Sequence, residues 1–278
     1  MSYREVRAPR ELAGLAECGW VDTATSDGPH EVLPDGCMDL VWTGAQLLVA
    51  GPDTMAHPGR RTRGVTVAGL RFLPGALPSL LGVPAAPLHN QRVALHELLP
   101  GPGREALARL EAGEEPVSVL AALAVRLPGD PPDRSVAALR RALAPSGPRS
   151  GDGEASPRVV RAIEAERVAG QAAGSGAADG SVAALADALG CTPRSVHRRC
   201  LAAFGYGPAT LRRVLRFRRA AALLRAGVSP AEVAATSGYA DQPHLSRETR
   251  ALAGVSPGQL ASGANRSTPL PSGSSTTA

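Results

Sequence analysis

Apolar residues recur at the three- and four-residue spacing of an α-helix through most of the last third of the chain. Runs with this pattern cover residues 182–189, 193–204 and 208–226, and a further stretch covers 229–257. Glycines stand at the ends of several of these runs, where a helix commonly stops. The pattern predicts an all-α C-terminal domain built from short helices around one long helix.

The stretch 229–257 predicts two helices joined by a tight turn. Val233 and Ala234 face inward in the first helix, Gly238 ends it, and Asp241 stands where an N-cap is needed. Leu245 and Leu252 then anchor the second helix. Its exposed face carries Gln242, Ser246, Arg247 and Arg250. An apolar helix followed by a helix with an exposed polar and basic face is the plan of a helix-turn-helix unit.

Residues 181–204 repeat the same plan. Ser181 caps one predicted helix, Thr192 caps the next, and Pro193 fits a first-turn position that needs no N–H donor. Val196 and Cys200 face the core in this second helix, so that Arg194, His197 and Arg198 share its outer side. The run 208–226 then predicts a connecting helix of nineteen residues, about 28 Å long at ~1.5 Å per residue.

The first hundred residues alternate in the two-residue period of β-strands. Residues 37–42 and 46–50 flank a short glycine turn at 43–45, which predicts a hairpin, and 64–73 predicts a strand in which Gly69 forms a bulge. Short helices are expected at 76–81 and 95–99. This pattern predicts a β-rich N-terminal domain, with a small barrel as its expected shape.

Proline breaks separate three helical runs, 104–111, 117–127 and 135–144. The apolar stripe of the second run either covers the sheet or forms a dimer face, and sheet cover is favoured. The whole chain is therefore predicted to be a two-domain α+β protein. Its expected parts are an N-terminal sensing or dimerisation domain at 1–145, a flexible linker at 146–156, a DNA-binding domain at 157–262 and a disordered tail at 263–278. The DNA-binding domain is expected to open with a helix at 158–168, followed by a disordered small-residue loop at 170–180.

The second unit resembles the C-terminal signature of the AraC/XylS-type transcriptional regulators. The resemblance rests on residues 238–247, GYADQPHLSR, and on the closing Gly-x-x-Pro at 254–257. The family has Phe where Thr249 stands, and Leu and Phe where Val196 and Cys200 stand; Phe204 is expected to compensate. The resemblance implies two helix-turn-helix units joined by a long helix, with one monomer reading two adjacent major grooves about 34 Å apart.

The N-terminal third resembles an uncharacterised domain found ahead of AraC-type DNA-binding domains. The residues that carry this resemblance are 33–42, LPDGCMDLVW, together with Gly51-Pro52 and 69–75, GLRFLPG. No ligand is implied by it, only a position and a role in regulation.

Charge is divided unequally between the two predicted domains. Residues 181–262 hold eleven Arg against four acidic residues, a net charge of +7, whereas residues 1–180 have a net charge of −3. The basic excess predicts a polyanionic partner for the C-terminal domain alone. Because the chain has Arg and no Lys, its arginines reflect a biased composition and are not each selected for recognition.

Neither the cysteines nor the apolar segments indicate a metal, a cofactor or a membrane. The four cysteines lie outside any metal-ligand spacing, so we expect no metal and no cofactor. The chain opens with no signal-peptide pattern, and prolines break the uncharged run 72–91, so a cytoplasmic protein with no membrane contact is expected.

DNA contacts are assigned by position on the two outer helix faces. Base contacts are expected from Arg194, Ser195, His197 and Arg198 in the first unit, and from Gln242, Ser246 and Arg247 in the second. Phosphate contacts are expected from Thr192, Arg199, Arg212 and Arg250. His244 is expected to be a packed, hydrogen-bonded residue. Solvent is expected to surround most arginines of the connecting helix, which are Arg212, Arg213, Arg216, Arg218 and Arg219.

The favoured function is a sequence-specific transcriptional regulator that binds operator DNA. Its N-terminal domain senses a small molecule or forms a homodimer, and an activator would also contact RNA polymerase. The alternative is an enzyme or a partner-binding module with an accessory DNA-binding domain. An acid–base or metal cluster is one form of that alternative, although no spacing requires it and no catalytic residue is assigned. Its residues would be His30, Asp35, Asp39, Asp53 and His57.

Overall fold

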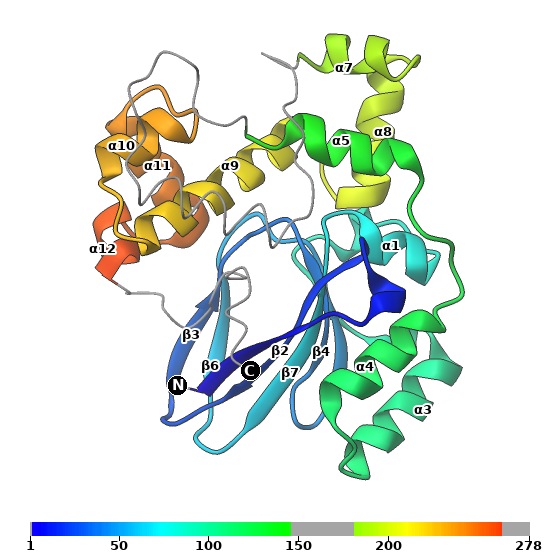
Figure 1. Cartoon of the computed structure of the whole chain (residues 1–278). Helices are drawn as coiled ribbons and strands as arrows, with labels where there is room; N and C mark the ends of the chain where they lie inside the picture. The colour runs from blue at the N-terminus through cyan, green and yellow to red at the C-terminus, as the bar shows by residue number, and fades with distance from the viewer. Residues whose placement is uncertain (1, 146–180, 263–278) are drawn as a thin grey trace.

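The structure, a computed structural model, describes residues 2–145 and 181–262 (Figure 1). It has a β-rich N-terminal part and a helical C-terminal part, as the sequence predicts. The predicted linker at 146–156, helix at 158–168, loop at 170–180 and tail at 263–278 lie outside the described residues.

The N-terminal part contains an open antiparallel sheet of six strands and a separate two-stranded ribbon. The large sheet has the order β1-β2-β7-β4-β5-β8, and β3 pairs with β6 in the ribbon. Among the described residues β1 and β8 do not pair with each other, so the predicted barrel-like shape is wrong. The bounds of the strands are β1 Ser2–Arg7, β2 Ala16–Thr23, β3 Gly28–Val32, β4 Met38–Trp42, β5 Leu47–Ala50, β6 His57–Arg61, β7 Thr66–Phe72 and β8 Arg92–Ala94.

The predicted hairpin is confirmed, since β4 and β5 pair around the turn at 43–46. The predicted bulge is wrong. The pairing of β2 with β7 is irregular between Ala16 and Cys18, whereas Gly69 stays in register opposite Trp20. A Cβ atom at Gly69 would lie 2.3 Å from the Trp20 ring. Gly69 therefore has no side chain because the Trp20 ring packs closely against the backbone there, and the strand is not kinked at this residue.

The two faces of the large sheet have different environments because successive side chains point to opposite sides. Leu40, Leu70 and Phe72 are fully buried in a core cluster, together with residues of α3 and α4. Asp39 and Arg71, next to these in sequence, line a cavity on the opposite face. Leu120, Leu123, Ala124 and Leu127 join the core cluster, so the apolar stripe covers the sheet, as favoured.

The helices match most of the predicted ones, with α12 as an addition. In the N-terminal part their bounds are α1 Ala76–Leu81, α2 Leu95–Leu98, α3 Pro100–Glu111, α4 Pro116–Val125 and α5 Arg134–Leu143. In the C-terminal part they are α7 Val182–Ala188, α8 Pro193–Phe204, α9 Pro208–Arg225, α10 Pro230–Thr236, α11 Gln242–Ala253 and α12 Pro257–Ser262. Within the described ranges, no helix has both the length and the apolar character needed to cross a bilayer.

The C-terminal helices form two core clusters at opposite ends of α9. The first cluster joins α7 and α8 to the start of α9, and the second joins α10, α11 and α12 to its end. Figure 1 shows α9 running from the α7–α8 unit to the α10–α11 unit. α5, in the segment assigned to the N-terminal domain, contributes Val136, Leu139 and Leu143 to the first cluster.

Candidate nucleic-acid interface

Local capping builds the second helix-turn-helix unit, α10 and α11. Ser229 Oγ accepts a hydrogen bond from the Glu232 N–H at 3.3 Å at the start of α10. Gly238 has a φ of 74° in the turn, a conformation that favours glycine. Asp241 Oδ1 accepts from the His244 N–H at 2.6 Å and so caps α11 as predicted. These contacts fix where α11 begins and therefore which of its side chains face outward.

The outer face of α11 carries the predicted DNA contacts. Leu245 and Leu252 are fully buried, whereas Gln242, Arg247 and Arg250 are exposed. Ser246 lies between them and is partly exposed. Side chains that can donate to base edges or phosphates therefore lie along one accessible face of this helix.

His244 is held against the unit, in agreement with its expected packing role. Its Nδ1 accepts from the Ala240 N–H at 3.3 Å. Its ring packs edge-on against Tyr239 with the two ring centroids 5.3 Å apart. This orientation requires Nδ1 to be unprotonated, so the ring supports the turn.

The first unit, α7 and α8, has the same construction. Thr192 Oγ1 accepts from the Ser195 N–H at 3.2 Å, and the hydroxyls of Thr192 and Ser195 lie 3.1 Å apart. Val196 and Cys200 are fully buried, and Phe204 belongs to the same core cluster, which agrees with its expected compensating role. Burial raises the pKa of the Cys200 thiol to about 11, so this cysteine is a packing residue.

The residues expected to contact DNA from α8 differ in accessibility. Arg194, His197 and Arg198 are exposed, while Ser195 and Arg199 are partly buried. Hydrogen bonding from Ser135 lowers the pKa of Asp133, the residue that caps α5, and the positive charge of Arg199 adds to this. Arg199 therefore lies near a carboxylate of this chain and is partly exposed to solvent.

The connecting helix α9 is tied to α11 by charged side chains. Arg213 Nε donates to Glu248 Oε2 at 2.6 Å, and Arg216 lies over the Tyr239 ring at 4.7 Å from its centroid. A guanidinium over an aromatic face is attractive. Together these contacts hold the second recognition helix at a fixed orientation to α9.

Two arginines of α9 do not lie on a solvated face as predicted. Arg218 and Arg219 are buried, with 9% and 3% of their surface exposed. Arg218 instead pairs with Glu17 of β2, on the N-terminal part. Arg212 is partly exposed and stays a predicted phosphate contact. The sequence could not reveal the buried pair because its members are 201 residues apart.

Thr249 occupies the position where the family has Phe. Its side chain is fully buried and its hydroxyl donates to the Leu245 carbonyl at 2.8 Å. The hydroxyl is therefore satisfied within the helix, as a buried polar group must be. Phe217 of α9, which is also buried in this cluster, supplies an aromatic ring to the same core.

The five residues weighed as an acid–base or metal cluster all line one cavity in the N-terminal part. Each of the three aspartates, however, forms an ion pair with an arginine: Asp35 and Asp39 with Arg71, and Asp53 with Arg92. Nowhere in residues 2–145 and 181–262 do three or more His, Cys, Asp or Glu residues gather in a metal-binding arrangement. All three aspartates that line this cavity are therefore engaged by arginines of the same chain.

Comparison with known families assigns both parts of the chain. Residues 185–262 match the family model of a helix-turn-helix domain, and residues 4–94 match that of a domain of unknown function, DUF6597. The chain carries an AraC-type DNA-binding domain. The matched range includes both recognition helices, α8 and α11. The AraC-type domain supports a DNA-binding transcription regulator.

Solved structures give a more distant comparison. ToxT from Vibrio cholerae O395 is 10% identical, with a TM-score of 0.38, over 94% of this chain and 97% of that chain. An apo ToxT variant from Vibrio cholerae strain SCE256 is also 10% identical with a TM-score of 0.38, over 88% of this chain and 96% of that chain. No curated protein matches the chain.

Proposed function

We propose that the regulator recognises a specific DNA sequence by placing α8 and α11 in two adjacent major grooves. The observation that carries this proposal is that both helices are N-capped, both expose a polar and basic face, and one continuous helix joins their units. α9 has eighteen residues and spans about 27 Å at ~1.5 Å per residue. Recognition helices in successive grooves need to be about 34 Å apart, which this length and the widths of the units allow.

Residues on the two faces have distinct proposed roles. Arg194, Ser195, His197 and Arg198 contact bases from α8, and Gln242, Ser246 and Arg247 contact bases from α11. Phosphate contacts are proposed for Thr192, Arg199, Arg212 and Arg250. Because Thr192 Oγ1 accepts the hydrogen bond from the Ser195 N–H, its hydroxyl can still donate a hydrogen bond to a phosphate oxygen and leave the cap in place.

We also propose that the N-terminal domain senses a small molecule. A cavity of about 430 Å³ lies on the open face of the large sheet, which supports sensing. It is within the size range of small-molecule sites. The alternative role, dimerisation through the apolar stripe of α4, is not supported, since that stripe is buried against the sheet.

Binding of the purified full chain to fragments of its own upstream DNA tests the proposal. Fluorescence anisotropy is measured at two salt concentrations with excess non-specific competitor DNA. Saturable binding of one fragment that survives the competitor is the expected result. Binding that falls equally for all fragments as salt rises would leave only a basic domain, and would favour an enzyme or partner-binding module.

A further inference from the structure

The N-terminal cavity lies between the open face of the large sheet and the β3–β6 ribbon. β2, β4, β5 and β7 contribute one wall, and His30, His57 and their neighbours contribute the other. Apolar side chains such as Val41, Leu48 and Val67 make up much of the lining. Trp20 also lines it and stacks with Tyr3, with the ring centroids 6.4 Å apart. A flat aromatic wall within an apolar cavity suits a planar or largely apolar ligand.

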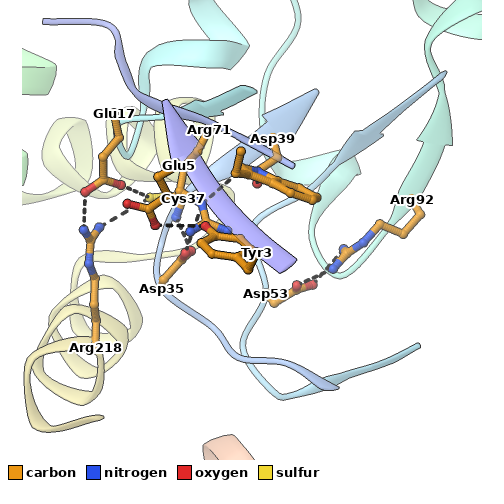
Figure 2. A network of polar contacts seen from close by, with 11 residues as sticks. Tyr3, Glu5, Glu17, Asp35, Cys37, Asp39, Asp53, Arg71, Arg92 and Arg218 are labelled. Carbon is orange, nitrogen blue, oxygen red and sulfur yellow. Dashed lines mark hydrogen bonds and ion pairs between the residues drawn. The ribbon is translucent and has the colours of Figure 1, made fainter. Parts of the chain in front are cut away.

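Most charged side chains around the cavity are paired with neighbours, whereas Arg60, which also lines it, is exposed. Arg61 pairs with Asp22 and Arg92 pairs with Asp53, each at 2.6 Å. On the sheet, Arg71 faces two carboxylates at 3.3 Å and 3.6 Å, those of Asp39 and Asp35 (Figure 2). Because two acidic groups surround this one buried arginine, a further anion would be repelled. The cavity therefore favours a neutral ligand over a carboxylate or phosphate.

One strong donor on the cavity wall is not used within the protein. Arg71 has only 4% of its surface exposed, and its Nη1 has no hydrogen-bond partner among the described residues. A buried guanidinium N–H without a partner is costly. A ligand with a carbonyl or hydroxyl oxygen would accept this hydrogen bond after a small shift of the side chain.

One segment forms both a wall of this cavity and a contact with the DNA-binding domain. The segment, residues 33–37, joins β3 to β4 and is buried throughout. Leu33, Asp35 and Cys37 line the cavity. Leu33 also belongs to the core cluster of α9–α12. A Cβ atom on Gly36 would lie 3.3 Å from Leu215 of α9. Packing therefore connects this segment to α9, because packed interiors have little free space.

A chain of polar contacts runs along the same segment from Arg71 to α9 (Figure 2). Asp35, paired with Arg71, accepts a hydrogen bond from the Cys37 N–H at 2.8 Å. Arg218 of α9 donates to Cys37 Sγ at 3.4 Å and forms an ion pair with Glu17. The Cys37 thiol in turn donates to Glu17 at 3.5 Å. The cavity wall and the connecting helix therefore share one buried polar network.

We propose that this cavity binds a neutral, largely apolar molecule with one hydrogen-bond acceptor, and that segment 33–37 couples its occupancy to α9. The inference rests on the proposed sensing and DNA-binding function and names its ligand class and its route. α9 joins the α7–α8 unit to the α10–α11 unit. A shift of α9 would therefore change how well α8 and α11 can occupy two grooves at the same time. Ligand binding and DNA binding then affect each other reciprocally.

The ligand class is tested without DNA. The probe is prodan, a neutral planar aromatic ketone whose fluorescence changes in apolar surroundings, and the anionic probe 8-anilinonaphthalene-1-sulfonate is the comparison. We expect saturable binding of one prodan per chain, at least tenfold weaker in Val41→Trp, which fills the cavity. The control Val125→Trp, at an exposed position of α4, should bind like the original chain. Absence of saturable prodan binding, equal binding in Val41→Trp, or tighter binding of the anionic probe would overturn the ligand class.

The coupling is tested by a double-mutant cycle on DNA affinity, which needs no ligand. Val41→Trp mimics an occupied cavity, and the paired change Glu17→Gln with Arg218→Met removes both charges of the ion pair that links β2 to α9. Val41→Trp should change the dissociation constant for the specific fragment by at least about fivefold in the original chain. In the paired background we expect a smaller change, since only the packing contacts of segment 33–37 with α9 remain. An equal change in both backgrounds would overturn the polar route from segment 33–37 to α9, and no change in either background would overturn the coupling.

The two arms also separate this inference from the proposed function. If no DNA fragment binds specifically, the proposed function fails, whereas the prodan arm still reports on the cavity. If specific DNA binding is present and the cycle shows no interaction, only the polar route from segment 33–37 to α9 fails.

Discussion

Replacing Arg218 by Met removes the positive partner of a carboxylate that is buried between the two domains. The Glu17 side chain is 1% exposed and that of Arg218 is 11% exposed, so water does not screen this pair. Removing one member of a buried ion pair costs about 3–5 kcal/mol, because the remaining charge is left without a partner in a medium of low polarity. The lower end, about 3 kcal/mol, is expected here since the domains can separate and let water reach Glu17.

The paired change Glu17→Gln with Arg218→Met supplies the matched control. It removes both charges and keeps side chains of similar size, and replacement of a buried ion pair in this way is often close to neutral. We expect a loss of at most about 1 kcal/mol. The difference between the single and the paired variant isolates the cost of the unpaired carboxylate from any loss of packing.

Urea unfolding followed by tryptophan fluorescence measures this effect. Both tryptophans of the chain, Trp20 and Trp42, lie in the N-terminal domain, so the signal reports the domain that contains Glu17. Far-UV circular dichroism, which reports mainly the helices, is recorded in parallel because a two-domain chain need not unfold in one step. A loss below about 1 kcal/mol for Arg218→Met alone, or an equal loss in both variants, would refute the reasoning from burial.

Three further predictions follow from the described contacts. Arg247→Ala and Arg194→Ala should each weaken binding of the specific DNA fragment by about 1–3 kcal/mol, measured by fluorescence anisotropy. The control is Arg104→Ala, at an exposed position of α3, which should not change the affinity. Arg250→Ala should lower the slope of log affinity against log salt by about one unit with little loss of sequence preference; an unchanged slope would remove its assignment as a phosphate contact. Gly69→Ala should destabilise the N-terminal domain by about 1–3 kcal/mol in the urea assay, because its methyl group would meet the Trp20 ring, and the paired change with Trp20→Leu should restore part of that loss.

Helix boundaries in the C-terminal part could be predicted because their signals are local. Ser181, Thr192, Ser229 and Asp241 each accept a hydrogen bond from an N–H in the first turn of the helix that follows. A cap acts within three residues, so sequence alone specifies it. The outer faces of α8 and α11 follow from the same boundaries and the helical period.

Contacts between distant segments could not be predicted in this way. No sequence pattern near Arg218 identifies it as the partner of Glu17, and helical periodicity alone predicts a solvated position for Arg218. The role of Gly69 depends on the ring that the neighbouring strand places over it, which only the strand register decides. Closure of a barrel likewise depends on whether β1 and β8 meet, and strand patterning carries no information about that pairing.

The groove assignment is tested most directly by methylation protection of the specific DNA fragment. Two protected patches in the major groove, about 10 base pairs apart, are expected on a fragment bound by one chain. Arg194→Ala should lose protection at one patch and Arg247→Ala at the other. A single patch, or loss of both patches together in either variant at saturating protein, would contradict reading of adjacent grooves by α8 and α11.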